Sequence, residues 1–149
     1  MMFPRIAVVA YDSSHDFNIL KPIHKMDFLV NTEIHIVHIV KRVFYGDGLS
    51  FNVTFLEQED QAPLRIAIIN TMKDFVHGIL PTCHVGKVKF ECIFGDDPKE
   101  DFCRYLQSSK ADLGLIASRE KHGFFDSSFA YYVSTHAPCS VIVTRSKEF

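Results

Sequence analysis

The sequence lacks several features that would place it in a protein class at once. Its 149 residues contain no tryptophan, no CxxC pair and no cysteine–histidine set at zinc spacing. No apolar run approaches the ~18–20 residues that a membrane helix needs, and the apolar run before Asp12 has no small-residue cleavage pattern. We therefore expect a soluble, cytoplasmic protein without a membrane span, a signal peptide or a zinc site. Its cysteines are expected to stay reduced. They are Cys83, Cys92, Cys103 and Cys139.

The charge of the chain is nearly balanced. Sixteen basic and eighteen acidic residues give a formal net charge of −2, which argues against a protein that mainly neutralises a nucleic-acid backbone. Hydrophobic residues make up 47% and charged residues 23% of the chain. This is ordinary globular composition and excludes a disordered chain. A length of 149 residues suits one domain over residues 1–149.

Apolar and alternating runs predict strands, and amphipathic stretches between them predict helices. The strands are expected at 5–11, 33–40, 87–94, 112–117 and 140–144. Helices are expected over 12–30 with an interruption at Pro22, over 63–79, from Asp97 onward, and over 125–136. Asp97 should cap the third of these helices, with Glu100 completing a capping box. Residues 41–61 are predicted to lie outside the core.

This alternation of strands and helices predicts an α/β fold. Strands separated by helices form a parallel sheet with helices on both faces, joined by right-handed crossovers. Strand 87–94 alternates polar and apolar residues, as expected of a half-exposed edge strand. In such sheets ligands bind beyond the carboxyl ends of the strands. The places to look are 11–14, 39–42 and 116–123.

The sequence contains few of the motifs that carry chemistry. It has no Walker lysine loop, GxGxxG, GxSxG or HExxH motif. His35 and His38 are three apart in a strand, so they should point to opposite faces and cannot share a metal. Asp12 could cap a helix or contact a ligand, and both interpretations stay open. The small positive cluster that begins at Arg119 could be a solvated loop or a phosphate site.

Four stretches resemble the universal stress protein family. They are RIAVVAYDSS, IHIVHIV, FGDDPKEDFCRYLQSSKADLGLIASR and STHAPCSVIVTRS. The resemblance implies a Rossmann-like open sandwich whose five parallel strands lie in the order 3-2-1-4-5. It also implies a homodimer formed through the last strand, here Ser140, Val141, Ile142, Val143 and Thr144.

One branch of that family binds ATP through a glycine motif, which this chain lacks. The motif is a glycine, two residues, a second glycine, nine residues, and a glycine followed by serine or threonine. The glycines are needed because side chains at those positions would obstruct the phosphates. Here the two glycine positions hold Ala117 and Glu120, and the closing pair is Ser127-Ser128. Only the six residues 121–126 lie between Glu120 and Ser127, where the motif has nine. The chain therefore resembles the branch without the ATP motif.

Taken together, these observations predict a homodimeric binding or regulatory module of the stress response that is not an enzyme and has no cofactor. Its protein partner is not specified, and neither nucleic acid nor membrane is expected. The alternative is a nucleotide-binding (ATP or AMP) universal stress protein with a degenerate phosphate loop. A further alternative is a redox-responsive protein that uses Cys83 or Cys139. The resemblance gives the candidate residues of a vestigial nucleotide pocket as Asp12, Ile39, Ala117, Arg119, Ser127 and Ser128.

Overall fold

The computed structural model describes most of the predicted strands and three helices. The described residues are 4–11, 31–41, 44–46, 52–54, 58–79, 87–119 and 123–146. The predicted helix over 12–30, with Asp12 and Pro22, lies outside these residues, as do Cys83 and Glu120.

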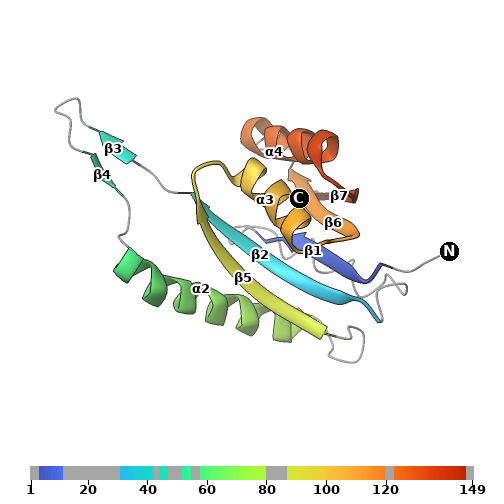
Figure 1. Ribbon diagram of the computed structural model, residues 1–149, viewed down its shortest axis with the longest axis horizontal. Helices are drawn as coiled ribbons and strands as arrows, with labels where there is room; N and C mark the ends of the chain where they lie inside the picture. Colours follow the sequence, from blue (N-terminus) through green and yellow to red (C-terminus); the bar gives the residue numbers. More distant parts are fainter. Residues whose placement is uncertain are drawn as a thin grey trace.

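Five parallel strands form the main sheet (Figure 1). They are β1 (Ile6–Ala10), β2 (Glu33–Lys41), β5 (Lys87–Gly95), β6 (Leu113–Arg119) and β7 (Ser140–Ser146). Their order across the sheet is β5-β2-β1-β6-β7. Numbered among themselves along the chain, this is the order 3-2-1-4-5, so the predicted topology is confirmed. β5 lies at one edge, as its alternating pattern predicted.

Helices cover both faces of this sheet, which confirms the predicted α/β class (Figure 1). α2 (Gln58–Ile79) lies on one face, and α3 (Pro98–Ser108) and α4 (Gly123–His136) lie on the other. No helix in the described part of the chain is long and apolar enough to cross a membrane.

The core consists of two apolar clusters, one on each face of the sheet. On one face Met72 and Val76 of α2 pack against β1, β2 and β6. On the other face Phe102 and Leu106 of α3 and Val133 of α4 pack against the same three strands. Successive side chains of a strand point to opposite faces, so the central strands supply both clusters.

Two elements extend further than predicted. α2 begins at Gln58, five residues before Pro63. A proline this close to the start of a helix removes only one backbone hydrogen bond. β6 continues to Arg119 because β7 runs alongside it to Ser146 and the two strands stay in register.

Residues 44–46 and 52–54 form a small hairpin outside the main sheet, as predicted for 41–61, but Lys41 belongs to β2 and the segment from Gln58 onward belongs to α2. β3 (Phe44–Gly46) and β4 (Asn52–Thr54) pair antiparallel in a two-stranded sheet of their own. Figure 1 shows this hairpin projecting from the end of β2, away from the five-stranded sheet.

The turn from β5 into α3 differs from the predicted capping box. Asp97 is the N-cap residue with extended backbone, and Pro98 follows it in the first turn. The prediction that Glu100 completes the cap is wrong. Instead, Oδ2 of Asp101 accepts a hydrogen bond from the backbone N–H of Asp97 at 3.3 Å. The carboxylate of Asp97 makes no cap bond because it pairs with Nζ of Lys99 at 3.0 Å.

This arrangement requires a glycine at position 95. A Cβ there would overlap the Asp101 carboxylate, which accepts from Asp97 N–H and also pairs with Arg104 Nη1 at 2.9 Å. We expect Gly95→Ala to lower the free energy of unfolding by about 1–3 kcal/mol, because the carboxylate must leave its donors. Urea unfolding measures this. Gly114→Ala is the matched control, since its Cβ would meet side chains at an ordinary 3.5 Å. Equal losses in the two variants would contradict the prediction.

Candidate functional site

The carboxyl ends of the strands hold the residues that the sequence nominated. Ile39, in β2, is half-buried and packs with the α3/α4 cluster. Ala117, in β6, is half-buried and packs with the α2 cluster. The two side chains therefore lie on opposite faces of the sheet, and a ligand touching both positions would have to meet the backbone of at least one.

The other nominated residues are placed by their backbone alone. Arg119 ends β6 and pairs with Ser146 of β7. Ser127 and Ser128 lie within α4, which begins at Gly123. Asp12 lies outside the described residues. The structure thus brings Ala117 and Arg119 together on one strand, while Ser127 and Ser128 belong to the helix that follows it.

Tyr11 and His38 occupy this edge, and the sequence analysis did not foresee the contact between them. Tyr11 is buried in the α2 cluster, and its backbone N–H donates to the Val37 carbonyl at 2.8 Å. Nδ1–H of His38 donates to the Tyr11 carbonyl at 2.9 Å, and the two rings meet edge to face with centroids 6.1 Å apart. These contacts satisfy the backbone where β1 ends. The sequence signals were the position of Tyr11 at the end of an apolar run and the predicted orientation of His38; neither pairs the two residues.

His35 lies on the opposite face from His38, as predicted, and forms a buried polar chain. Its exposed fraction is 6%. Nε2 lies 2.8 Å from Oε2 of Glu33, and Nδ1 lies 2.7 Å from the Tyr105 hydroxyl. A carboxylate only accepts, so in the neutral imidazole Nε2–H donates to Glu33 and Nδ1 accepts from Tyr105. Among the described residues no His, Cys, Asp and Glu side chains gather into a metal site.

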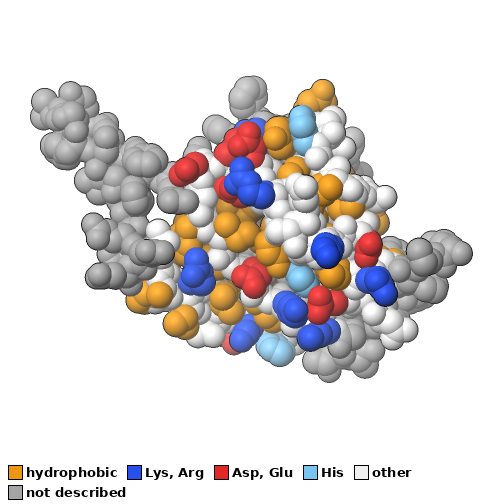
Figure 2. Space-filling model, viewed as in Figure 1, with side chains coloured by type: hydrophobic (Ala, Val, Ile, Leu, Met, Phe, Trp, Pro, Cys, Tyr) orange, Lys and Arg blue, Asp and Glu red, His pale blue; other side chains and the backbone are white. Residues whose placement is uncertain are grey.

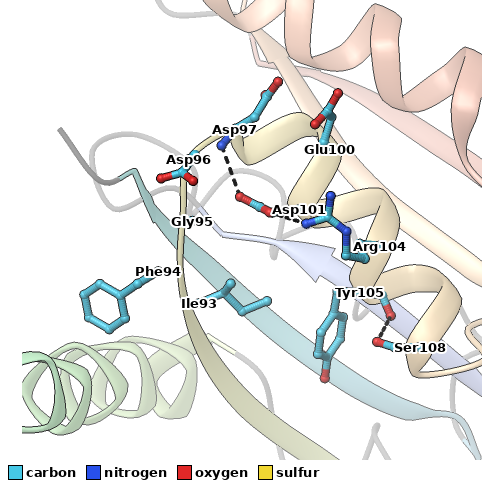
Figure 3. A pocket seen from close by; sticks show the side chains of 10 residues that line it. All are labelled: Ile93, Phe94, Gly95, Asp96, Asp97, Glu100, Asp101, Arg104, Tyr105 and Ser108. Carbon is cyan, nitrogen blue, oxygen red and sulfur yellow. Dashed lines mark hydrogen bonds and ion pairs between the residues drawn. The ribbon is translucent and has the colours of Figure 1, made fainter. Parts of the chain in front are cut away.

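A cavity of about 490 Å³ lies beside this chain, between the end of β5 and one flank of α3 (Figure 3). Its lining residues are Ile93, Phe94, Gly95, Asp96, Asp97, Glu100, Asp101, Arg104, Tyr105 and Ser108. Four of these carry carboxylates and one carries a guanidinium. The surface around it mixes both signs of charge (Figure 2). Because carboxylates outnumber the single guanidinium in its lining, the cavity disfavours a phosphate group. The acidic run in FGDDPKED was the available sequence signal.

Burial sets the direction of the pKa shift at the Tyr105 end of the polar chain, and hydrogen bonding sets it at the Glu33 end. Burial, together with the nearby carboxylates of Glu91 and Glu33, raises the pKa of Tyr105 from 10.0 to about 12. The hydrogen bond from His35 lowers the pKa of Glu33, and Lys89 lowers it further. Both effects favour a neutral phenol facing an ionised Glu33 across His35.

The described cysteines are free thiols. Burial raises the pKa of Cys92, Cys103 and Cys139. A raised thiol pKa lowers the thiolate fraction at neutral pH and with it the reactivity. This weakens the redox interpretation for Cys139, and Cys83 lies outside the described residues.

Comparison with known proteins finds likeness in structure only. No protein-family model and no curated protein matches the chain. Universal stress protein UspA from Lactobacillus plantarum has 19% identity over 94% of this chain and 97% of its own, with a TM-score of 0.60. The universal stress protein from Archaeoglobus fulgidus in complex with dAMP has 16% identity over 95% and 98%, with a TM-score of 0.58. A universal stress protein family protein from Arabidopsis thaliana with AMP bound has 16% identity over 97% of this chain and 93% of its own, with a TM-score of 0.56.

The chain has the fold of universal stress proteins. The likeness spans almost the whole of each chain, and the strand order agrees with the one that the sequence resemblance implied. At this low identity the likeness concerns the fold.

Tyr105 gives a test of the polar chain. Tyr105→Phe leaves Nδ1 of buried His35 without its donor, so we expect a loss of about 1–3 kcal/mol in the free energy of unfolding at pH 7. The pKa of Tyr105 is raised in the folded state, so its contribution is present below pH 10 and is lost as pH rises to about 12. The parent should therefore lose more stability over this interval than Tyr105→Phe does.

Chemical unfolding at pH 7 and at several pH values above 9 measures both effects. Tyr131→Phe is the control, because Tyr131 is 73% exposed. If Tyr105→Phe matches Tyr131→Phe at neutral pH, the hydrogen bond to His35 contributes nothing and the prediction is wrong.

Proposed function

We propose that this chain is a universal stress protein of the type without the ATP motif. It would act as a homodimeric binding or regulatory module of the stress response, in the cytoplasm and without catalysis. The fold, the four matching stretches and the missing glycine motif support this proposal.

The observation that carries the proposal is the course of β6 past Ala117. Ala117 pairs with Thr144, and the ladder continues to Arg119 and Ser146. The position at which the resemblance expects the first motif glycine is therefore an alanine inside a strand. Its methyl group packs with the α2 cluster, so the backbone there is less accessible to a phosphate than a glycine loop would be.

The nucleotide-binding alternative favours a nucleoside monophosphate as the ligand. Structural neighbours were solved with AMP, with dAMP and with cAMP bound. A ligand with one phosphate avoids most of the repulsion that Glu120 would exert on a triphosphate. This supports the nucleotide-binding alternative for AMP more than for ATP.

The homodimer is proposed from the exposed edge of β7. β7 ends the strand order, so its outer side has no strand partner in the part of the chain that the structure describes. Val143 is 40% exposed there. An apolar strand edge favours pairing with a second copy, and a two-fold pairing would use the same residues from both chains.

We expect ATP to bind weakly or not at all. Like charges a few ångströms apart cost on the order of 1–4 kcal/mol even when partly screened, and Glu120 stands where the motif has glycine. Isothermal titration with ATP and magnesium should show no heat of binding below millimolar concentration. Glu120→Gln should bind ATP up to about tenfold more tightly than the parent, and Glu91→Gln, on β5, should not. A micromolar Kd, or ATP released from the purified parent on denaturation, would promote the nucleotide-binding alternative.

We expect the chain to dimerise and Val143→Lys to shift it toward monomer. The lysine adds a charge to the proposed contact, which is costly to bury without a partner. Sedimentation equilibrium at micromolar concentration should give about twice 17.1 kDa for the parent. Lys110→Ala, a surface change outside β7, is the control. A monomeric parent would contradict the proposed dimer.

A further inference from the structure

β5 forms the other edge of the sheet, and its hydrogen-bond register shows which peptide groups face outward. Glu33 and Val37 of β2 bond to Arg5 and Tyr11, at the two ends of β1, so the even-numbered residues of β2 face β5. His38 is in register with Cys92. In this parallel ladder the odd-numbered residues of β5 bond to β2, and Val88, Phe90 and Cys92 direct their N–H and C=O groups outward.

The charges on β5 are arranged symmetrically about Phe90. Lys89 precedes it and Glu91 follows it, both on the α3 face, and the side chain of Lys89 is 48% exposed. If a second copy paired antiparallel about Phe90, Lys89 of each chain would lie opposite Glu91 of the other. Val88 would lie opposite Cys92. Opposite charges facing each other across two strands stabilise such a pair.

Arg65 of α2 occupies this edge. Its Nε–H donates to the outward carbonyl of Cys92 at 3.2 Å, and its guanidinium lies 5.3 Å from the centre of the Phe94 ring. The Cys92 carbonyl is one of the groups that pairing about Phe90 would use. Arg65 therefore satisfies the carbonyl within the chain and stands where a second strand would pair.

We propose that the outer edge of β5 is an interface for a second copy of this chain, in antiparallel register about Phe90, and that Arg65 closes it in the separate protein. The contact is distinct from the one proposed at β7, since the two strands are opposite edges of one sheet. It does not depend on the proposed function. Withdrawal of Arg65 opens the edge, and the Lys89–Glu91 pairs then fix the register.

The test uses the full chain with Val143→Lys, so that β7 does not contribute to association. With Arg65 present, sedimentation equilibrium should show a mass near 17.1 kDa at all concentrations. Adding Arg65→Ala should double the mass as concentration rises. Adding Lys89→Glu to that variant should abolish the doubling, and Lys89→Glu with Glu91→Lys should restore it. Arg104→Ala, at an exposed arginine of α3, is the matched control and should not associate.

Hydrogen exchange gives a second readout on the same proteins. In Arg65→Ala the amides of Val88, Phe90 and Cys92 should become more protected as concentration rises. Arg65→Gln, which loses the guanidinium but keeps a polar group at the end of its side chain, is run beside Arg65→Ala and should behave alike, so that misfolding of one variant does not decide the outcome. An unchanged mass in a folded Arg65 variant would overturn the proposal. So would association that persists with Lys89→Glu alone, or aggregates without a defined size.

Discussion

The buried strand β1 is the element on which the rest of the sheet depends. Ala7, Val8 and Val9 have no exposed surface, and their side chains alternate between the two faces. Both faces must therefore be covered by helices, as parallel sheets require. β2 and β6 bond to β1 on either side and satisfy its peptide groups. Burying a large apolar side chain contributes roughly 1.5–3 kcal/mol, so this central layer supplies much of the driving force for folding.

The coverage of the two faces is unequal, and the cavity follows from that inequality. On the α3/α4 face the helices pack mainly over β1, β2 and β6, and the end of β5 borders the cavity beside α3 (Figure 3). This border is lined by polar and charged residues together with Ile93 and Phe94. His35 must be satisfied because it is buried, and it is satisfied by Glu33 from its own strand and by Tyr105 from α3. The same contacts attach α3 to the sheet.

The two edges of the sheet are treated differently by the sequence. β7 has a short apolar edge on which Val143 is exposed, whereas β5 has lysines, a glutamate and the Arg65 contact along its edge. Charged side chains and covering groups are the usual means by which proteins protect an edge from pairing. This difference between the two edges is the basis of the two proposals, self-association through β7 and pairing at β5 that Arg65 controls.

The sequence by itself determined the strands, most helices, the edge position of β5 and the opposite orientation of His35 and His38. These features depend on local periodicity, which is two residues in a strand and 3.6 in a helix. Only the tertiary structure decided that Asp101, instead of Glu100, bonds to the N-cap, and that Tyr105 reaches His35. The His35–Tyr105 contact joins elements 70 residues apart, which no local pattern encodes. The cap contact is local, but it depends on the side-chain conformation that Asp101 adopts beside Arg104. The strand order also needed more than local pattern, because the same alternation of strands and helices is compatible with several arrangements of the sheet.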